Sequence, residues 1–324
     1  MNMATQNMAA RNSVLSLKSV YKRFQQTVAL HDVSLDVPSG VVFALLGENG
    51  AGKSTLIKIL TGYESADYGH ASVLGRDCDF ESMEIRRKIG YVSDAPALYE
   101  WMTPPEIGWF TSAFYPKGFL TRYQQLLAEF NVPAETKIKN LSKGQRAKVA
   151  LALAIGHDPE LLILDEPTSG LDPMVRRQFL ESMVDRAAVG RTVLLSSHQI
   201  SEVERVADWV AILHHGQLKV VAPLEELKTE VQMVTATVDS LGSVVPVPRG
   251  EVLTEVHTGR QIRWIVKNLP DDWRDDFPPS AGATKLSAQR ATLEEIFIAI
   301  CDDRATRPVV EDDAALSRPL EALS

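Results

Sequence analysis

A glycine-rich segment early in the chain combines the residue types that hold phosphate groups. Residues 47–54 follow the pattern G-x-x-x-x-G-K-[ST], directly after the apolar run 41–46 and before a helical run over 55–60. Glycines let backbone N–H groups turn toward an anion, and a helix N-terminus adds a favourable dipole. This setting favours phosphate binding over an ordinary glycine-rich turn. The predicted phosphate loop comprises Gly47, Glu48, Asn49, Gly50, Ala51, Gly52, Lys53, Ser54 and Thr55.

Two adjacent carboxylates, Asp165 and Glu166, end the apolar run 161–164. Buried carboxylates are costly unless they are paired or bound to a metal ion. Asp165 therefore suits Mg²⁺, which the Ser54 hydroxyl can also ligate, and Glu166 suits a general base acting on water. Lys53 can reach the β- and γ-phosphates of a nucleotide. The alternative is a solvated strand end, which the phosphate loop in the same chain makes less favourable.

A third motif, Leu141-Ser142-Lys143-Gly144-Gln145, lies between the first two along the chain. Ser142 is a natural N-cap, so we predict a helix from here to Ile155. The free N–H groups of that helix, together with the hydroxyl, make a second anion site, and the alternative is an ordinary helix start.

The order of these motifs resembles the nucleotide-binding subunits of ABC transporters. LSKGQ resembles the LSGGQ signature of that family, and Ser169-Gly170-Leu171-Asp172 resembles its D-loop. His198, after the run 192–197, resembles its switch histidine. The resemblance extends over about residues 14–227. It implies a P-loop NTPase fold with a mostly parallel sheet, an antiparallel β subdomain and a helical subdomain.

The resemblance also implies roles for single residues. Phe24 falls where the family stacks an aromatic ring on adenine, although a core aromatic is the alternative. Ser142 and Gly144 would contact the γ-phosphate held by the opposite subunit, and His198 a γ-phosphate in its own site. Asp172 would lie at the dimer interface. The catalytic candidates are thus Glu166, His198 and Lys53, with ATP and Mg²⁺ as cofactors.

Two positions depart from the family pattern. Asp94 stands after the predicted strand 89–92, where the family usually has glutamine. Both side chains offer oxygen to Mg²⁺, but aspartate is shorter and charged. We therefore assign Ser54, Asp94 and Asp165 to the metal site. The replacement of glutamine by Asp94 is expected to affect the coupling of the ATPase to its membrane partner, which this loop mediates in the family. Lys143 replaces the commoner glycine of the signature, where its charge would favour a triphosphate.

These side chains need elements that bring them to one place. Continuous apolar runs at 41–46, 161–164, 192–195 and 209–213 read as buried strands, and 14–17 and 33–37 as half-exposed ones. Helical stretches between them predict a parallel α/β sheet. A helical insert is expected at about 97–140, with a helix starting at the capping box Thr103–Glu106. The ATPase domain is then expected over residues 13–229.

The remaining segments read as accessory. Strands at 231–238, 251–256 and 261–266 and a short helix around Phe297 predict a β-rich accessory domain over residues 230–301, without catalytic residues. Its expected role is regulation or dimer support, through Trp264 and that helix, or plain packing. Residues 1–12 and the acidic segment 302–324 are expected to be disordered.

Composition narrows the class of protein. The 324 residues carry a formal charge of −8, which makes general nucleic-acid binding unfavourable, and no nucleic-acid partner is expected. Two cysteines exclude a disulfide scaffold. No apolar run reaches the roughly 18–20 residues that span a bilayer, so a separate transmembrane permease would have to do the spanning. The chain would then work at the cytoplasmic face of the membrane.

The leading hypothesis is therefore a transport ATPase, of bacterial exporter type by its segments 201–208 and 293–297, working with a second ATPase subunit in a homo- or heterodimer. The alternatives are an ABC-type ATPase that acts on DNA or ribosomes, and a regulator that binds nucleotide without hydrolysis. DNA-repair relatives usually carry a long insertion, and translation relatives two cassettes, whereas each motif occurs once here.

Overall fold

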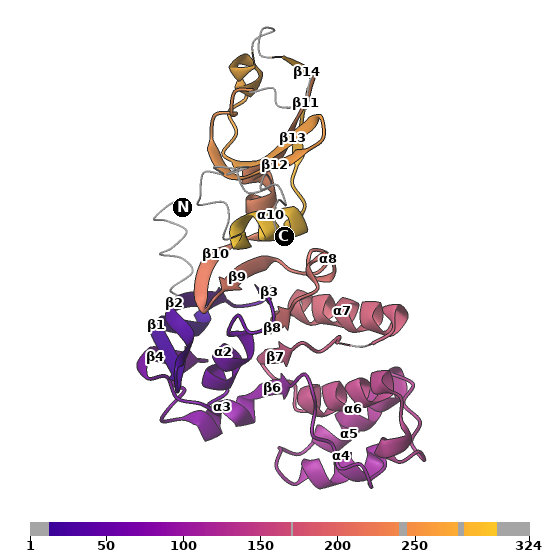
Figure 1. The fold of residues 1–324 in the computed structure, drawn as a ribbon. Coiled ribbons are helices and arrows are strands. Elements are labelled where there is room, and N and C mark those ends of the chain that lie inside the picture. The colour runs from indigo at the N-terminus through magenta and orange to yellow at the C-terminus, as the bar shows by residue number, and fades with distance from the viewer. Residues whose placement is uncertain (1–12, 170, 240–244, 278–281, 303–324) are drawn as a thin grey trace, which may run out of the picture. The chain divides into compact units, whose positions relative to one another are not determined.

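The computed structural model describes residues 13–169, 171–239, 245–277 and 282–302. The predicted disorder of residues 1–12 and of the tail beyond Asp302 lies outside these described residues, as does Gly170 of the D-loop motif. The chain divides into two compact units, the first ending at Leu227 and the second beginning at Lys228. This division lies close to the expected boundary after residue 229. Figure 1 labels the elements of both units.

A six-stranded sheet forms the centre of the first unit, in the order β10-β9-β3-β8-β7-β6. All neighbouring pairs are parallel except β9 and β10. Every residue of β3, β7 and β8 is buried, as expected for strands covered on both faces. The carboxyl ends of the five parallel strands therefore share one edge of the sheet. The strands are β3 (Val42–Leu46), β6 (Ile89–Val92), β7 (Leu161–Asp165), β8 (Thr192–Ser197), β9 (Trp209–His214) and β10 (Gln217–Pro223).

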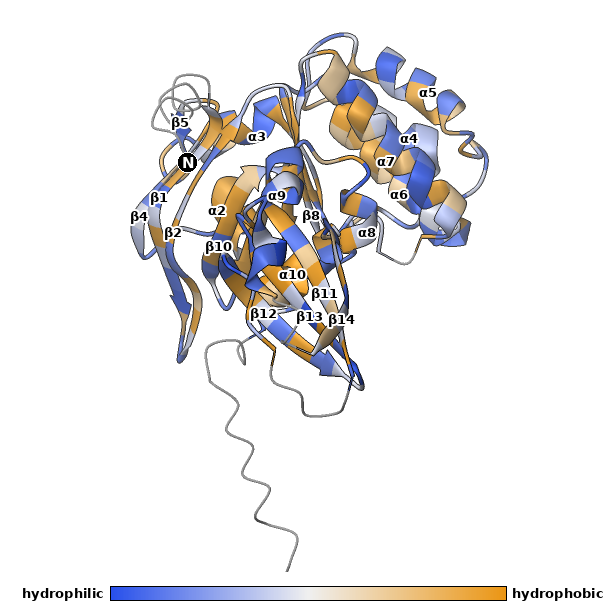
Figure 2. Cartoon of the chain, turned by 90° about the horizontal axis from the view of Figure 1, so that it is seen from above, coloured by the Kyte–Doolittle hydropathy of each residue, from blue (hydrophilic) through white to orange (hydrophobic). Residues whose placement is uncertain are grey.

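A second, antiparallel sheet has the order β2-β1-β4-β5. Helix α2 (Lys53–Leu60) contacts β2 and β4 of this sheet and β7 of the central one. Its apolar residues join both sheets in one core cluster, and Figure 2 shows α2 coloured largely as hydrophobic. The phosphate-loop helix is thus held between two sheets. The strands are β1 (Ser13–Phe24), β2 (Thr27–Pro38), β4 (Tyr68–Val73) and β5 (Arg76–Asp77).

Helices complete the first unit. A helical layer of α4, α5 and α6 follows β6, and it begins at the predicted capping box, where Glu106 accepts a hydrogen bond from the Thr103 N–H at 2.7 Å. Helix α7 contacts β3 and β8. The helices are α3 (Ser82–Lys88), α4 (Pro104–Ser112), α5 (Phe119–Glu129), η1 (Ile138–Asn140), α6 (Lys143–Ile155), α7 (Pro173–Ala188) and α8 (Ile200–Val203). A further helix, α9 (Leu224–Glu230), contains the division between the two units.

The second unit is built on an antiparallel sheet of order β12-β13-β11-β14. Helix α10 (Leu293–Cys301) contacts β12 and β13, and the turn η2 (Trp273–Asp276) supplies Trp273 to the core. Trp264 is fully buried in that core, so its role is packing and it offers no surface to a partner. The strands are β11 (Val231–Val238), β12 (Glu251–Thr258), β13 (Gln261–Lys267) and β14 (Ala283–Arg290).

The predicted α/β class with a mostly parallel sheet, an antiparallel sheet and a helical layer is confirmed. The strand β14 was not predicted from the sequence. Its residues ATKLSAQR are mostly exposed, so hydrophobic alternation is weak there, and its place in the sheet comes from pairing with β11.

Candidate active site

The phosphate loop joins the buried strand β3 to helix α2, as the motif predicts. Two of its glycines are required by close packing. A Cβ atom on Gly47 would lie 2.4 Å from the Leu213 carbonyl oxygen, and one on Gly52 would lie 2.5 Å from that of Ala29. Gly52 also has a φ of 110°, which other residues rarely adopt. The loop backbone can therefore take this path only with glycine at both positions.

Lys53 turns back over the loop that precedes it. Its Nζ atom donates to the carbonyl oxygens of Gly47 at 2.7 Å and Glu48 at 3.2 Å. The same ammonium lies 3.2 Å from Oε1 of Glu166, and the Lys53 side chain is only 6% exposed. The charge of Lys53 thus lies inside the loop and beside the carboxylate that follows β7.

Glu166 links the loop to His198. Its Oε2 atom lies 2.7 Å from Nδ1 of His198, on the opposite side of the carboxylate from the Lys53 contact. The backbone of Glu166 has a φ of 49°, an uncommon conformation for a non-glycine residue. Lys53, Glu166 and His198, predicted from three separate motifs, therefore meet at one edge of the sheet.

Ser196 is a residue of this site that the sequence analysis missed. Its hydroxyl donates to Oδ1 of Asp165 at 2.7 Å and accepts from the backbone N–H of Glu166 at 3.0 Å, and the residue is fully buried. It therefore holds the Asp165 carboxylate and the Glu166 backbone at the end of β7. The signal available in the sequence was the pair of serines, Ser196 and Ser197, directly after the predicted strand 192–195.

Asp165 is 5% exposed and ends β7, whose neighbour in the sheet is β6. Burial raises the pKa of the Tyr91 hydroxyl to about 12, and the negative charge of Asp165 adds to this shift. Asp94 lies two residues beyond β6 in an exposed segment. Because β6 and β7 are parallel neighbours, Asp94 and Asp165 follow adjacent strand ends.

Phe24 ends strand β1 and is 41% exposed, which excludes the alternative of a core aromatic. The Lys22 ammonium lies 5.1 Å from the centre of its ring. Lys22 is itself held by Glu64 at 3.3 Å and Asp67 at 3.4 Å. The exposed part of the ring can therefore stack on a planar ligand, and the cation–π contact with Lys22 holds the ring in place.

The signature residues lie on another element. Ser142 caps α6 and accepts from the Gln145 N–H at 3.2 Å, while the Gln145 side chain accepts from the Ser142 N–H at 2.9 Å. This confirms the predicted helix start. No hydrogen bond or ion pair joins the described residues of this motif to the phosphate loop. Gly144 faces Val175 of α7, where a Cβ atom would lie 3.3 Å away.

Asp172 caps helix α7. Its Oδ1 atom accepts from the N–H groups of Met174 at 3.1 Å and Val175 at 3.0 Å. The structure therefore brings Lys53, Asp165, Glu166 and His198 together, and it leaves Ser142, Gly144 and Asp172 on the starts of two helices outside that cluster.

The residues at the sheet edge fit a nucleotide and a magnesium ion. The loop has glycine wherever a side chain would collide with the backbone, and its cation lies inside. The groups at the β7 end are the carboxylates of Asp165 and Glu166 and the hydroxyl of Ser196, and oxygen donors of this kind are the ligands that Mg²⁺ prefers. Mixed α/β architecture with these groups at the carboxyl ends of parallel strands defines the class of P-loop nucleotide-binding proteins.

Comparison with known sequences identifies the family within this class. The family described as ABC transporter matches residues 30–169. An ABC transporter ATP-binding protein of Nostoc sp. is 35% identical over 69% of this chain and 70% of its own length. The lantibiotic transport ATP-binding protein SrtF of Streptococcus pyogenes is 32% identical over 63% of this chain and 89% of its own length. The Nod factor export ATP-binding protein I of Rhizobium sp. is 35% identical over 63% of this chain and 68% of its own length.

Solved structures agree with this assignment. The ATP-binding subunit of an ABC transporter matches with a TM-score of 0.62 and 32% identity, over 67% of this chain and 92% of its own. A dimeric ATP-binding cassette solved with ADP and phosphate shares the fold, with a TM-score of 0.60 and 24% identity, over 65% of this chain and 98% of its own. The chain belongs to the ATP-binding proteins of ABC transporters, and it is an ATPase. None of the helices within the described residues has the length and apolar character needed to cross a membrane.

Proposed function

We propose that this ATPase subunit hydrolyses MgATP in a head-to-tail dimer and thereby drives export through a separate transmembrane permease. The observation that carries the proposal is the contact of Lys53 and His198 with the two oxygens of one carboxylate, Glu166. Lys53 of the phosphate loop, the candidate base Glu166 and the candidate γ-phosphate sensor His198 are thus already in contact with one another through Glu166.

The chain's own residues divide the work at this site. Lys53 and the N–H groups of residues 47–55 bind the β- and γ-phosphates, and Phe24 stacks on adenine. Ser54, Asp165 and Asp94 would hold Mg²⁺, which would supply positive charge to neutralise the phosphates. Glu166 orients the attacking water and accepts its proton, and His198 holds Glu166 and contacts the γ-phosphate.

A second subunit completes the site. Ser142 and Gly144 open a helix whose exposed N-terminus can bind an anion. Among the described residues, no hydrogen bond or ion pair joins them to the phosphate loop of their own subunit. A two-fold dimer in head-to-tail orientation places each signature against the partner's nucleotide and creates two composite sites. Asp172 would then lie at the interface. Dimerisation in a related cassette supports this arrangement.

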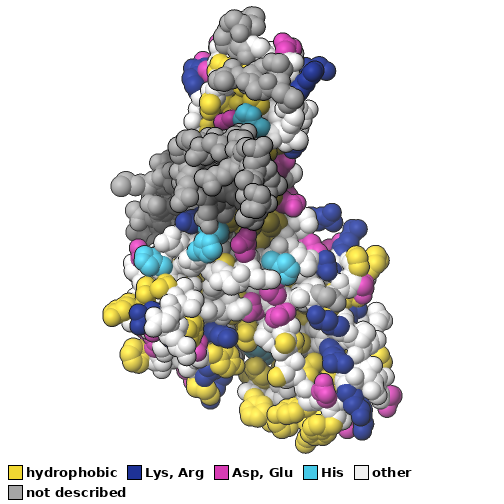
Figure 3. Space-filling view, viewed as in Figure 1, with side chains coloured by type: hydrophobic (Ala, Val, Ile, Leu, Met, Phe, Trp, Pro, Cys, Tyr) yellow, Lys and Arg dark blue, Asp and Glu magenta, His cyan; other side chains and the backbone are white. Residues whose placement is uncertain are grey.

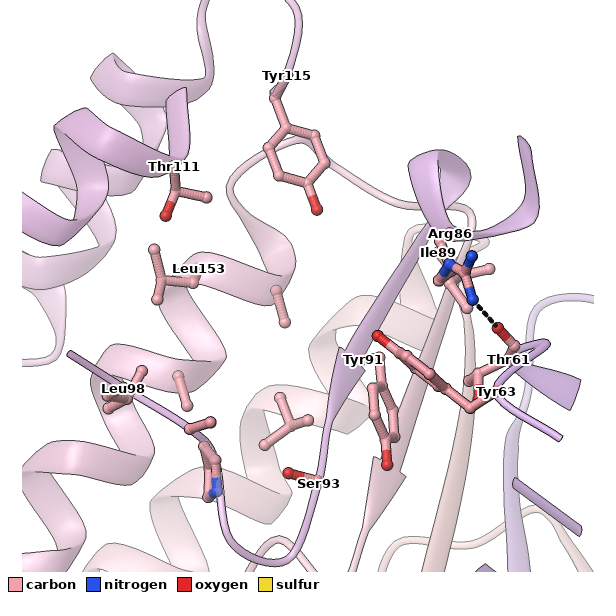
Figure 4. Close-up of a pocket in the computed structure, with 15 residues that line it drawn as sticks. Thr61, Tyr63, Arg86, Ile89, Tyr91, Ser93, Leu98, Thr111, Tyr115 and Leu153 are labelled. Atoms are coloured by element: carbon pink, nitrogen blue, oxygen red, sulfur yellow. Dashed lines mark hydrogen bonds between the residues drawn. The ribbon is translucent and has the colours of Figure 1, made fainter. Parts of the chain in front are cut away.

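A cavity and an exposed apolar surface lie near the segment that carries Asp94. The segment after β6 lines a cavity of about 300 Å³ together with Tyr63, Tyr91, Tyr115 and Leu153 (Figure 4). Exposed aromatic residues lie around α4, and Figure 3 shows apolar side chains gathered there. An apolar surface of this kind favours burial against another protein. We assign it to a cytoplasmic segment of the permease, which would hold the chain at the cytoplasmic face of the membrane. The exposed aromatic residues are Tyr99, Trp101, Trp109, Phe110 and Phe114.

Replacement of Lys53 tests the nucleotide site. Lys53→Ala should weaken ATP binding and abolish most hydrolysis, because the cation that follows the phosphates is lost. Lys58→Ala, an exposed lysine on the same helix, is the matched control and should behave as the parent. Nucleotide affinity is measured by titration and turnover by phosphate release. Unchanged affinity and turnover in Lys53→Ala would refute the assignment.

A further inference from the structure

The side chain of Arg176 joins the segment that precedes α7 to the segment that follows β8. Arg176 lies in the first turn of α7, and its Nη2 atom donates to the Leu171 carbonyl oxygen at 3.0 Å. Its Nη1 atom donates to Oε1 of Gln199 at 2.7 Å and forms an ion pair with Glu202 of α8. Figure 1 shows α7 and α8 as neighbours beside the sheet.

The partners of Arg176 stand next to residues of the proposed site. Leu171 immediately precedes Asp172, and Gln199 immediately follows His198. The segment that ends at Asp172 begins at Glu166. The guanidinium therefore holds Leu171, next to Asp172, and Gln199, next to His198, at a fixed separation.

The geometry suits arginine and no other residue type. A guanidinium presents its donors in a rigid plane, so it can bind two acceptors in different directions at once. The Arg176 side chain is 23% exposed and that of Glu202 19%, so water competes only partly for these bonds. Loss of the guanidinium would remove the hydrogen bonds to both Leu171 and Gln199.

We infer that Arg176 is a positioning residue, which keeps His198 against Glu166 and fixes Leu171 immediately before Asp172. This inference rests on the proposed function. Arg176 reaches the site only through Leu171 and Gln199 in these contacts, so it should affect turnover and leave the binding of ATP to the phosphate loop intact.

The neighbouring Arg177 provides a matched control. It pairs only along its own helix in these contacts, with Glu181 at 2.7 Å, and its side chain is 72% exposed. Arg177→Met removes the same type of side chain from the same turn of α7, without touching either loop.

The experiment compares kcat and KM for ATP in Arg176→Met and Arg177→Met. Arg176→Met should lower kcat by about 10-fold or more, because small displacements of catalytic groups are costly, with KM changed less than about 2-fold. Arg177→Met should match the parent. Equal kcat in the two variants, or a rise in KM as large as the fall in kcat, would overturn the inference.

Gln199→Ala tests the same path without leaving the Glu202 carboxylate unpaired. It should lower kcat by a smaller factor, and Arg176→Met/Gln199→Ala should be no slower than Arg176→Met alone. Independent, multiplicative effects would contradict a path through Gln199. Glu166→Gln is assayed in parallel. If it keeps parental turnover, the proposed function fails. If it is inactive while Arg176→Met equals Arg177→Met, only the present inference fails.

Discussion

At the scale of single residues, Glu166 is the group on which the proposed chemistry depends. Its backbone is held in an uncommon conformation by Ser196, and its two oxygens face Lys53 and His198. A carboxylate whose two oxygens each have a partner, on a backbone that is itself held, can orient a water molecule at low entropic cost. Its neighbour Asp165 is held by the same serine, so the two carboxylates keep different tasks.

Glu166→Gln should retain ATP affinity and lose hydrolysis by about 10²-fold or more, because glutamine keeps the shape but accepts no proton. With ATP, this variant should elute as a dimer in size-exclusion chromatography, because each trapped nucleotide bridges two subunits. Glu160→Gln, exposed before the other end of β7, is the control. Parental turnover in Glu166→Gln would transfer the role of base to another group, His198 first.

At the scale of elements, Asp158 ties the helical layer to the sheet. It follows α6 and pairs with Arg122 of α5 at 3.1 Å, with Arg191 before β8 at 2.5 Å, and with Arg186 of α7 at 3.9 Å. Burial by itself would raise the pKa of Asp158, but the hydrogen bond from Arg191 and the three positive charges lower it below the ordinary value of 3.8. The ion pairs therefore stabilise the folded protein while Asp158 is ionised.

Asp158→Asn should destabilise the protein at pH 7 by about 1 kcal/mol, a value reduced for the partly exposed carboxylate. Asparagine tolerates the positive φ of 56° at this position, so the backbone should be kept. Because the folded-state pKa is lowered, the stabilisation is present above pH 3.8 and is lost as pH falls through the folded-state pKa. Urea midpoints of parent and variant should thus differ at pH 7 and converge in acid. A constant difference would contradict this account, and Asp79→Asn is the exposed control.

At the scale of the whole molecule, the separation of Ser142 from the phosphate loop predicts that activity needs two subunits. Lys53→Ala and Ser142→Ala should each be nearly inactive alone. Mixed dimers retain one intact composite site, so an equal mixture should recover activity at about one quarter of the sites. A Lys53→Ala/Ser142→Ala double variant mixed with either single variant should recover none. Absence of recovery at every mixing ratio, or turnover per subunit independent of concentration in a monomer, would refute the composite site.

The second unit supplies the other prediction at this scale. It has its own sheet and its own core around Trp264, and every proposed catalytic residue lies in the first unit. A chain ending at Thr229 should therefore bind ATP with parental affinity, whereas its dimerisation or ATPase rate should change if the second unit supports the dimer. Circular dichroism controls for folding. A folded truncation that fails to bind ATP would place part of the second unit in the nucleotide site.

The sequence by itself determined the features that depend on neighbouring residues. The phosphate loop, the capped starts of α4 and α6, and the buried strands with carboxylates at one end all follow from local pattern, because turns, caps and periodicity are set within a few positions. The tertiary structure decided which of those features meet. Ser196 reaches Asp165 and Glu166 because β7 and β8 are neighbours in the sheet, and Arg176 reaches Gln199 because α8 lies beside α7. Asp158 gathers arginines from three segments for the same reason. Such contacts depend on strand order and helix packing, which join residues far apart in the chain and leave no mark in its local periodicity.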